Sequence, residues 1–566
     1  MTPKAPLEPT RVQHVQTHPQ ILTQHAHPST QAHQRRSAAA APPTPATPTT
    51  PASTATVAVV MVTWNRAADA RRAIESVLAQ RGVDLGNVHL VVVDNASTDG
   101  TTDTLAEWLI PERLVANDTD RAHEPAFKAT STDNANTAGL ASVTLVRNAA
   151  NMGGTGGFNT GFQVVEQLLT PDADVGFLWL LDDDAVADAN ALASLLRTAK
   201  NDPDAGLVGS RAVDIADRRT TYETTIYYDP AQGRMAETPH AGHRLHAAHA
   251  DWIADVGDSR GPHPFTGVRE VDVVSACSML ARWSVVQQVG YWDSRYFIYC
   301  DDADWCLRVG RAGHRVVCDL DAVVYHTPWF QKLTPTRLYY AQRNAIWTMR
   351  KGLSGNARRK STARWMVSVL RQSLAAGLRR RRFHAEILRR TALDAVADHA
   401  GKLDQAEPPH EPVLDAIVRL GLNRPDARIA LLCMTEDQHE LARTIKTALR
   451  DHLTTRCPIF VTISRNDAGP GDITYAPSTK SRIYRQIPML TNPPDACVVL
   501  NNTNDFPLLR CPATLHVDHR TPEQCQVEED RVPSRLAFLA RWSATACRAA
   551  WYVLRNRPQR PPAPFG

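Results

Sequence analysis

The sequence lacks the features of several large protein classes. No apolar run approaches the roughly 18 residues that would cross a bilayer, and the longest runs are short stretches such as VAVVMV at residues 57–62. The N-terminal stretch MTPKAPLEPTRVQHV has no apolar core of a secretory signal, and the cysteines include no C-x-x-C pair. These absences predict a protein of the reducing cytoplasm, without structural zinc or a disulfide framework.

Excess charge of one sign is also missing. The chain has 63 Lys and Arg against 59 Asp and Glu, a net charge of +4 over 566 residues. So small an excess excludes a polybasic nucleic-acid binder on composition, and we expect no nucleic-acid partner. With 43% hydrophobic residues, the chain has material for two or three packed domains.

The N-terminal residues differ in composition from the rest. Residues 1–56 are dominated by Pro, Thr, Ala, Gln and His, with too few large apolar groups to offset the entropy of ordering, which predicts a disordered tail. VAVVMVTWN, RAADARRAIESVLAQ and VHLVVVDNASTDG then predict a buried strand, a helix and a second buried strand. A helix at 101–109 and a strand at 143–147 continue the alternation, and 116–141 reads as a polar surface insertion. The pattern predicts an α/β fold with a mostly parallel sheet.

Three consecutive aspartates, Asp182, Asp183 and Asp184, follow the apolar run FLWLL, which predicts another buried strand. Hard divalent cations such as Mg2+ or Mn2+ take oxygen ligands, so two carboxylates at alternate positions are candidate metal ligands. Ligands of open α/β sheets bind beyond the carboxyl ends of the strands, so this cluster should face one cleft together with Asp94. A solvated, inert turn is the alternative.

A second acidic group, Asp301, Asp302 and Asp304, follows aromatic residues and precedes Trp305. Crowded carboxylates beside aromatic rings raise one another's proton affinity, as a general base near neutral pH requires. At a helix N-terminus they would equally be simple partners of the helix dipole. His326, after the apolar run AVVY, is either a metal ligand or a structural histidine.

The stretch NMGGTGGFNTG contains Gly153, Gly154, Gly156 and Gly157. Backbone N–H groups without side-chain cover can approach a phosphate or a sugar closely, and the N-terminus of a following helix favours anions. The spacing matches neither a P-loop nor G-x-G-x-x-G, which disfavours a P-loop hydrolase. A generic glycine loop alone is weak support for a binding site.

Basic charge concentrates in a predicted helical region. Between residues 351 and 390, twelve Lys and Arg stand against a single acid, Glu386. Interleaved apolar residues such as Trp365 and Met366 make this segment a candidate for lying on an anionic membrane surface. An ordinary helical pair packed on the preceding domain is an equal alternative.

The C-terminal part predicts a second α/β region. RIALLCM, HELARTIKTALRDHL, PIFVTIS and ACVVLNN read as strand, helix, strand and strand, with no catalytic or phosphate-loop motif, and one more helix is expected at 533–554. We therefore divide the chain into a tail (1–56), a first α/β domain (57–350), a basic helical segment with linker (351–410), a smaller α/β domain of unassigned role (411–520) and a C-terminal helix with a Pro/Arg-rich tail (521–566).

Taken in order, these motifs resemble the family 2 glycosyltransferases, inverting enzymes of the GT-A fold that use nucleotide-sugar donors. VVMVTWNR and VVVDNASTDGT resemble the family's first two strands, LLDDDA its Asp-x-Asp motif, and CDDADWCLR its catalytic acidic pair. LVRNAANMGGTGGFNTG and YYAQRNAIW are closest to the branch of bacterial galactofuranosyl- and rhamnosyltransferases. The resemblance runs from residue 57 to about residue 350.

The resemblance implies a role for each candidate residue. Asp182, Asp184 and His326 correspond to the ligands of a divalent cation, Mn2+ or Mg2+, and Asp302 to the base, with Asp301 beside it. The expected substrate-binding residues are Thr63 and Asp94 near the uridine, Arg147 near a phosphate, Asp183, the glycines Gly153, Gly154, Gly156 and Gly157, and Trp305 as part of an acceptor platform.

The sequence thus predicts a metal-dependent inverting hexosyltransferase of bacterial cell-wall or polysaccharide synthesis. It would move a sugar, galactofuranose by the closest resemblance, from a nucleotide-diphosphate donor to a hydroxyl of a glycan or lipid-linked glycan. The alternatives are a rhamnosyltransferase that uses dTDP-rhamnose, a nucleotidyltransferase, and a non-catalytic nucleotide-sugar or glycan-binding protein. We expect a cytoplasmic location, with residues 351–390 as the candidate contact to the inner face of the plasma membrane.

Overall fold

The computed structural model describes residues 56–555, except 122–123, 133–134, 333, 379–380, 406–407, 434, 466–468, 476–492, 501–510, 518–520 and 530–531. The tail predicted over residues 1–56 therefore lies almost wholly outside the described residues. The described residues belong to one compact unit, Pro51–Gly566.

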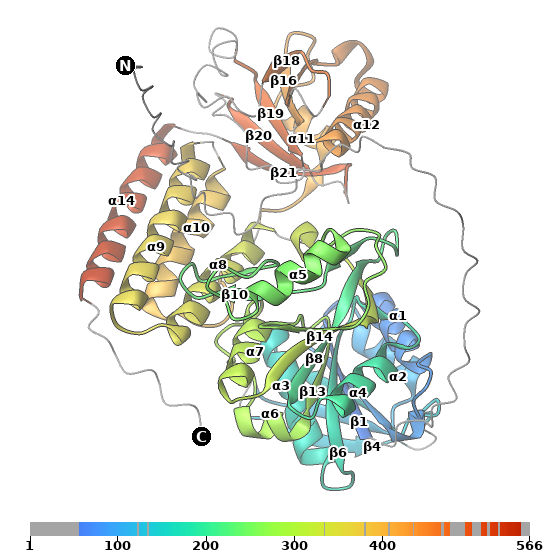
Figure 1. Cartoon of the computed structure of the whole chain (residues 1–566). Helices are drawn as coiled ribbons and strands as arrows, with labels where there is room; N and C mark the ends of the chain where they lie inside the picture. Colours follow the sequence, from blue (N-terminus) through green and yellow to red (C-terminus); the bar gives the residue numbers. More distant parts are fainter. Residues whose placement is uncertain are drawn as a thin grey trace, which may run out of the picture. The chain divides into compact units, whose positions relative to one another are not determined.

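The larger sheet has twelve strands (Figure 1), in the order β12-β14-β8-β13-β6-β1-β2-β5-β3-β4, with β7 paired to β14 and β9 to β8. The neighbours from β6 to β3 are parallel, and β13 runs antiparallel between β6 and β8, which confirms the predicted mostly parallel α/β fold. The strands are β1 (Thr56–Thr63), β2 (Val88–Asp94), β3 (Arg113–Asn117), β4 (Phe127–Ser131), β5 (Ser142–Asn148), β6 (Val175–Asp182), β7 (Val186–Ala187), β8 (Ala205–Asp214), β9 (Thr221–Glu223), β12 (Val268–Val271), β13 (Ser278–Arg282) and β14 (Arg315–His326).

Side chains of β1 alternate between two hydrophobic cores, one on each face of the sheet. Val57, Val59 and Met61 pack with residues of α1, α2 and α4, whereas Ala58 and Val60 pack with residues of α3, α6 and α7. A strand that is buried on both faces requires a continuous apolar run, which VAVVMV supplies. The helices are α1 (Ala67–Leu78), α2 (Thr101–Leu109), α3 (Gly153–Val164), α4 (Ala191–Asn201), α6 (Trp283–Val289) and α7 (Asp301–Arg311).

The glycine-rich stretch forms the helix α3 itself rather than a loop before a helix. A Cβ atom at Gly157 would lie 2.4 Å from Val62 Cγ1, and one at Gly161 would lie 2.2 Å from Val60 Cγ1. Only glycine lets α3 approach β1 this closely. Part of the glycine pattern is therefore explained by helix-to-sheet packing.

Two stretches have more regular structure than the sequence predicts. Within 116–141, expected as a surface insertion, β4 pairs antiparallel with β3 and extends the edge of the sheet. Residues 214–269, whose less regular sequence pattern predicts only a β-hairpin and loop, contain β9, the hairpin β10 (Tyr227–Asp229) and β11 (Arg234–Ala236), and the helix α5 (His246–Val256).

Three long helices lie in the regions predicted to be helical, 351–410 and 533–554, and a fourth, α8 (Pro335–Gly352), precedes them. The three are α9 (Gly355–Leu378), α10 (Arg382–Ala397) and α14 (Val532–Arg555), which pack on one another (Figure 1). Trp365 and Met366, which the sequence suggested for a membrane surface, are 4% and 3% exposed. These apolar side chains therefore pack inside the protein, as the alternative interpretation of this segment expects.

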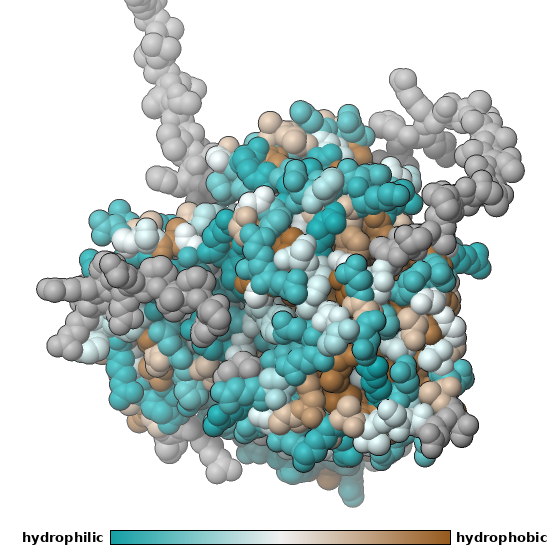
Figure 2. Space-filling model, turned by 90° about the horizontal axis from the view of Figure 1, so that it is seen from below, coloured by the Kyte–Doolittle hydropathy of each residue, from teal (hydrophilic) through white to brown (hydrophobic). Residues whose placement is uncertain are grey.

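None of the helices over the described residues combines the length and apolarity needed to cross a membrane. Figure 2 shows one face of the molecule, on which hydrophilic and hydrophobic residues are mixed.

The second sheet has seven strands in the order β15-β21-β20-β19-β16-β17-β18. β16, α12, β17 and β19 confirm the predicted order of strand, helix, strand and strand, while β20 and β21 were not predicted. The elements are β15 (Glu411–Pro412), α11 (Val413–Arg419), β16 (Arg428–Cys433), α12 (Glu436–Leu453), β17 (Ile459–Arg465), β18 (Ile473–Tyr475), β19 (Ala496–Leu500), β20 (Ala513–Val517) and β21 (Gln524–Glu529).

Candidate active site

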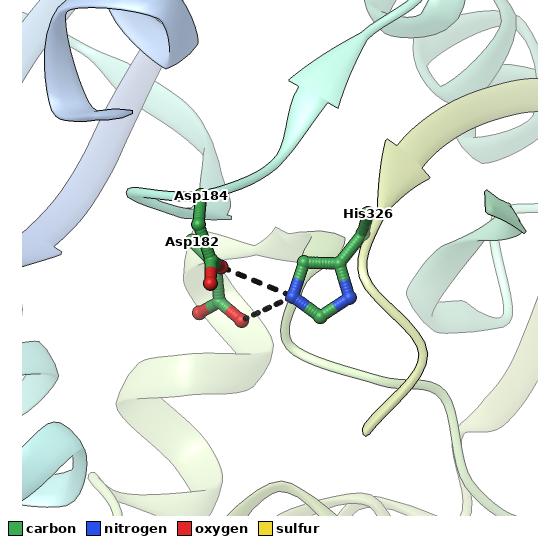
Figure 3. A group of neighbouring side chains, drawn as sticks. All are labelled: Asp182, Asp184 and His326. Atoms are coloured by element: carbon green, nitrogen blue, oxygen red, sulfur yellow. Dashed lines mark hydrogen bonds and ion pairs between the residues drawn. The ribbon is translucent and has the colours of Figure 1, made fainter. Parts of the chain in front are cut away.

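The first acidic cluster and His326 meet because two distant strands pair. Asp182 is the last residue of β6, and the short strand β7 that follows pairs antiparallel with the end of β14, where His326 lies. His326 Nε2 is 3.1 Å from Asp184 Oδ1 and 3.7 Å from Asp182 Oδ2 (Figure 3). One ligand atom from each of the three residues lies within 4.8 Å of the others.

A tyrosine fixes the orientation of the imidazole. Tyr222, on β9, places its hydroxyl 2.8 Å from His326 Nδ1, and both side chains are buried. A partner on one ring nitrogen leaves the other, here Nε2, facing the carboxylates, as in proteins whose histidines ligate metals. Two carboxylate oxygens and one imidazole nitrogen form a donor set that suits Mn2+ or Mg2+.

Two cationic side chains, Arg66 and Lys332, contact this cluster. Asp184 Oδ2 lies 2.6 Å from Arg66 Nη1 and 2.7 Å from Lys332 Nζ. Lys332 Nζ also lies 2.7 Å from His326 Nε2. Burial would raise the pKa of Asp184, but the hydrogen bond from His326 and the charges of His326, Lys332 and Arg66 hold it well below its usual range. Asp184 is therefore ionised at neutral pH.

Asp182 and Asp183 differ from Asp184, because their pKa values are raised. Burial, opposed by His326, raises the pKa of Asp182. Burial and the charge of Asp184 raise the pKa of Asp183 to about 7. Asp183 accepts a hydrogen bond of 2.8 Å from the Thr63 hydroxyl at the end of β1. Thr63 therefore contacts the acidic turn directly, although its side chain is buried.

The second acidic cluster begins α7. Asp301 accepts a hydrogen bond of 2.5 Å from the hydroxyl of Thr155 on α3. Asp302 accepts hydrogen bonds from the backbone N–H groups of Ala303, at 2.7 Å, and Ala276, at 3.3 Å. Burial raises the pKa of Asp301 to about 6, and burial together with the charge of Asp301 raises that of Asp302 to about 7. A carboxyl with this pKa can accept a proton near neutral pH.

The two clusters lie close to one another on the same edge of the sheet. The backbone N–H of Asp182 donates to the carbonyl of Cys277 at 3.3 Å, and the adjacent Ala276 donates to the Asp302 carboxylate. The charge of Asp182 contributes to the raised pKa of Asp301 and of Asp302. The adjacent residues Ala276 and Cys277 thus bridge the two clusters, one by a hydrogen bond to each.

A cavity of about 950 Å³ opens beside Asp184. Five cationic side chains lie on its wall, and the half-exposed ring of Trp64 lies beside them. Such a cavity has the size and the positive charge for an anionic ligand larger than a phosphate ion. The lining residues are Trp64, Arg66, Asp69, Arg72, Asp184, Ile215, Thr327, Lys332, Thr334, Thr336, Arg337, Tyr340, Lys402, Leu403 and Gln405.

The other residues expected to bind the donor vary in exposure. Asp94 is fully buried; its Oδ2 accepts hydrogen bonds from Ser97 N–H and the Thr102 hydroxyl, while Oδ1 has no partner among the described residues. Arg147 lies opposite Asp94 in the β2–β5 register and is exposed. An unpartnered buried oxygen suits a ligand N–H or O–H group.

The predicted glycine residues are placed at the start of α3. Gly153 has a φ of +73°, and a Cβ atom there would lie 2.0 Å from the carbonyl oxygen of Phe297. Gly154 follows it, and Gly156 and Gly157 are buried in the helix. The backbone at Gly153 thus packs against the segment that leads into the second acidic cluster.

Trp305 lies in the hydrophobic core, which corrects the expectation that it forms part of an acceptor platform. Its side chain is fully buried, it stacks on Phe162 with ring centroids 5.8 Å apart, and its Nε1 donates to the carbonyl of Gly290 at 2.9 Å. A sugar cannot reach the ring in this arrangement. Trp64, at the cavity, is an exposed tryptophan that the sequence did not single out.

Several residues of the site were not predicted from the sequence. Arg66, Lys332 and Tyr222 surround the first cluster, and Thr155 bonds to the second. Glu223 lies near the second cluster, because burial and the charge of Asp302 raise its pKa to about 7. Arg66 could have been found, because it directly follows the strand-end sequence TWN, whereas the other residues become neighbours only through the fold.

Comparison with known proteins identifies the family. The family model described as glycosyltransferase like family 2 matches residues 54–367, more than half of the chain. None of the curated proteins matches the sequence.

Solved structures of glycosyltransferases are similar to the chain. GalNAc-T7 with UDP, GalNAc and Mn2+ is 13% identical, with a TM-score of 0.38 over 55% of this chain and 51% of that chain. The mannosyltransferase PcManGT from Pyrobaculum calidifontis, in complex with GDP-Man and Mn2+, is 15% identical, with a TM-score of 0.34 over 72% of this chain and 86% of that chain. TarS from S. aureus is 12% identical, with a TM-score of 0.35 over 61% and 49% of the two chains. The chain thus spans about half the length of GalNAc-T7 and TarS.

The predicted family resemblance over residues 57–350 agrees with the range that the family model matches. The mostly parallel sheet covered by helices on both faces, with carboxylates at its carboxyl edge, is the architecture expected of that family. This chain belongs to the family described as glycosyltransferase like family 2.

Proposed function

We propose that the enzyme is a metal-dependent inverting hexosyltransferase that moves galactofuranose from a UDP-linked donor to a hydroxyl of a glycan or a lipid-linked glycan. The observation that carries this proposal is the compact donor set of Asp182, Asp184 and His326 next to a second acidic cluster whose carboxyl groups Asp301 and Asp302 have raised pKa values. Asp184 is held ionised, whereas Asp302 has a pKa of about 7. A ligand of a cation needs the first property and a general base needs the second.

Asp182, Asp184 and His326 would hold a divalent cation, Mn2+ or Mg2+. The compact donor set and the hydrogen bond between Nδ1 of His326 and the Tyr222 hydroxyl, in which Nδ1 donates when Nε2 binds a cation, support this assignment. A cation bound there would supply Lewis-acid stabilisation of the negative charge on the departing diphosphate.

The cationic cavity beside Asp184 would receive the anionic part of the donor. Arg66 and Lys332 lie at the boundary between this cavity and the first cluster, where they can contact phosphate oxygens. The unpartnered Oδ1 of Asp94 would accept a hydrogen bond from the nucleoside, with Thr63 and Arg147 nearby. Asp183 and the glycines at the start of α3 remain proposed contacts of the donor.

Asp302 would remove the proton from the acceptor hydroxyl as the oxygen attacks the anomeric carbon. The bond from the anomeric carbon to the donor phosphate breaks on the opposite face, so the configuration at this carbon inverts. Asp301, fixed by Thr155, would keep Asp302 short of full ionisation by like-charge repulsion.

A thermal-shift screen with product analysis tests the proposal. The purified chain is heated with UDP-galactose, UDP-galactofuranose, UDP-glucose or dTDP-rhamnose, each with and without Mn2+. A ligand at about 100 times its Kd stabilises the folded state by about 2.7 kcal/mol, so we expect the largest rise in Tm for UDP-galactofuranose with Mn2+.

The other outcomes are equally informative. A selective response to dTDP-rhamnose would assign the enzyme to the rhamnosyl branch, and a product of retained anomeric configuration by NMR would contradict the inverting mechanism. A rise in Tm that does not depend on Mn2+ would contradict the metal site. A donor that binds without transfer to any glycan acceptor would favour a binding protein over an enzyme of this specificity.

A further inference from the structure

The segment that leads into the catalytic acidic pair has an unusual backbone. Phe297, Tyr299 and Cys300 have φ angles of +69°, +69° and +61°, in the left-handed region that residues other than glycine rarely adopt. Asp301, the first residue of α7, follows immediately. Three left-handed residues within four positions persist only where surrounding contacts hold them.

Asn344, on α8, supplies such contacts from one side. Its Nδ2 lies 2.9 Å from the carbonyl oxygen of Tyr296 and 2.8 Å from those of Ile298 and Tyr299. The two N–H bonds of this one amide thus lie within hydrogen-bond distance of three carbonyl oxygens of residues 296–299. From the other side, Thr155 of α3 donates its backbone N–H to the carbonyl of Phe297 at 3.1 Å.

Arg343 orients this amide. Its Nε donates to Asn344 Oδ1 at 3.0 Å, which turns the NH2 group of the amide toward the segment. Its Nη2 donates to the carbonyls of Arg295, at 3.2 Å, and Tyr296, at 2.9 Å. The guanidinium lies 4.4 Å from the ring centroid of Trp347 and has no exposed surface. A buried guanidinium is costly unless its donors are satisfied; the carbonyls of Arg295 and Tyr296 satisfy Nη2, while those of His399 and Gly401 accept from Nη1.

We propose that Arg343 and Asn344 are positioning residues for the transfer reaction, which act by holding residues 296–300 in the left-handed path that presents Asp302 to the acceptor. This inference rests on the proposed role of Asp302. A displacement of about 1 Å at a reacting group can cost about a hundredfold in rate. A segment that leads directly into the base is where such a displacement would begin.

The alternative is that the pair stabilises the fold with no particular effect on catalysis. The variant Asn344→Leu, of similar size but without donors, separates the two. We expect kcat for transfer to fall by about a hundredfold, while the Kd for Mn2+ and the KM for the donor change less than about threefold. Amide hydrogen exchange in peptides that cover residues 296–302 should become faster, with exchange in β1 and β2 unchanged. Ile346→Val, at a buried position two residues along the same helix, is the matched control: it should lower Tm slightly and leave kcat unchanged.

A double-mutant cycle gives the decisive result. If Asn344 acts through Asp302, then Asn344→Leu in an Asp302→Asn background should lower the residual rate less than about threefold. A full hundredfold loss in that background, or unchanged kcat in the single variant despite a lower Tm, would overturn the proposal. If Asn344→Leu does not fold, Arg343→Lys keeps the buried charge but loses the planar fork, and the same cycle with that variant decides.

The proposed function and this inference fail in different ways. If Asp302→Asn retains full activity, the base assignment fails whatever Asn344 does. If Asp302→Asn is inactive but Asn344→Leu has normal kcat and normal exchange at residues 296–302, only the positioning role fails.

Discussion

The two acidic clusters at the edge of the large sheet contain the same residue type in contrasting surroundings. Asp184 contacts His326, Lys332 and Arg66, whose charges lower its pKa despite burial. Burial and the charge of Asp301 raise the pKa of Asp302 to about 7, although its carboxylate accepts hydrogen bonds from two backbone N–H groups. Cationic neighbours therefore lower the pKa of Asp184, whereas burial beside another carboxyl raises that of Asp302.

The contrast shows how one sheet edge can hold two chemical roles. A cation is bound by carboxylates that stay ionised, whereas a base must exchange a proton near the working pH. Burial raises the pKa of Asp182 and Asp183, whereas the hydrogen bond from His326 and the charges of His326, Lys332 and Arg66 overcome burial at Asp184.

The largest effect on the rate of transfer is expected when the proposed base, Asp302, is replaced. Asp302→Asn keeps the size of the side chain but cannot accept the acceptor's proton, and kcat for transfer should fall by about a thousandfold. The Kd values for Mn2+ and UDP, measured by calorimetry, should stay within about threefold because the first cluster is untouched. Full transfer activity in this variant would contradict the assignment of the second cluster.

Breaking the first cluster should have a smaller and different effect. Asp184→Asn removes the ionised ligand, and the Kd for Mn2+ should rise by about a hundredfold, measured by Mn2+ electron paramagnetic resonance. Asp183→Asn is the matched control, since Asp183 bonds to Thr63 and lies outside the three-residue donor set; its Kd for Mn2+ should change less than about threefold. Equal losses in the two variants would contradict the assignment of ligands.

The pH dependence should sharpen the contrast further. Because the pKa of Asp302 is raised to about 7, the fraction of ionised base, and with it kcat/KM, should fall about tenfold per unit as the pH drops below about 7. Stability has the opposite trend: the folded carboxyl holds its proton more tightly than the unfolded one, so its contribution to the free energy of unfolding declines from about pH 4 to about pH 7. Asp302→Asn should therefore raise Tm most clearly above about pH 7. A flat pH profile of kcat/KM in the wild type would contradict a base of this pKa.

The strand pattern and the acidic clusters could be predicted because their signals are local. The runs VAVVMV and FLWLLDDD predict buried strands, the second with carboxylates at its end. In a parallel sheet the carboxyl ends of the strands lie at one edge. The pairing of His326 with the aspartates required the added family resemblance, since β7 has only two residues and gives no pattern of its own.

The residues that tune the site could not be predicted, because their positions depend on tertiary structure. Lys332 and Tyr222 reach the first cluster from segments with no motif, and Asn344 acts on a backbone conformation that no composition reveals. The burial of Trp305 could have been predicted, because Trp305, Cys306 and Val309 recur at helical spacing and form a buried face. The adjacent acidic residues instead suggested a place at the acceptor site.

The smallest expected effect concerns the cation that Lys332 contributes to the first cluster. Its ammonium contacts both Asp184 and His326, so a divalent cation bound by these residues must displace it or share its position. Lys332→Met should therefore lower the Kd for Mn2+ by about threefold to tenfold without nucleotide, equivalent to about 0.6–1.4 kcal/mol. Lys402→Met, which removes a charge from the same cavity wall, is the control and should leave this Kd nearly unchanged. A weaker affinity for Mn2+ in Lys332→Met would instead mean that Lys332 holds the ligands in place for the metal, and that the ionised state of Asp184 depends on it.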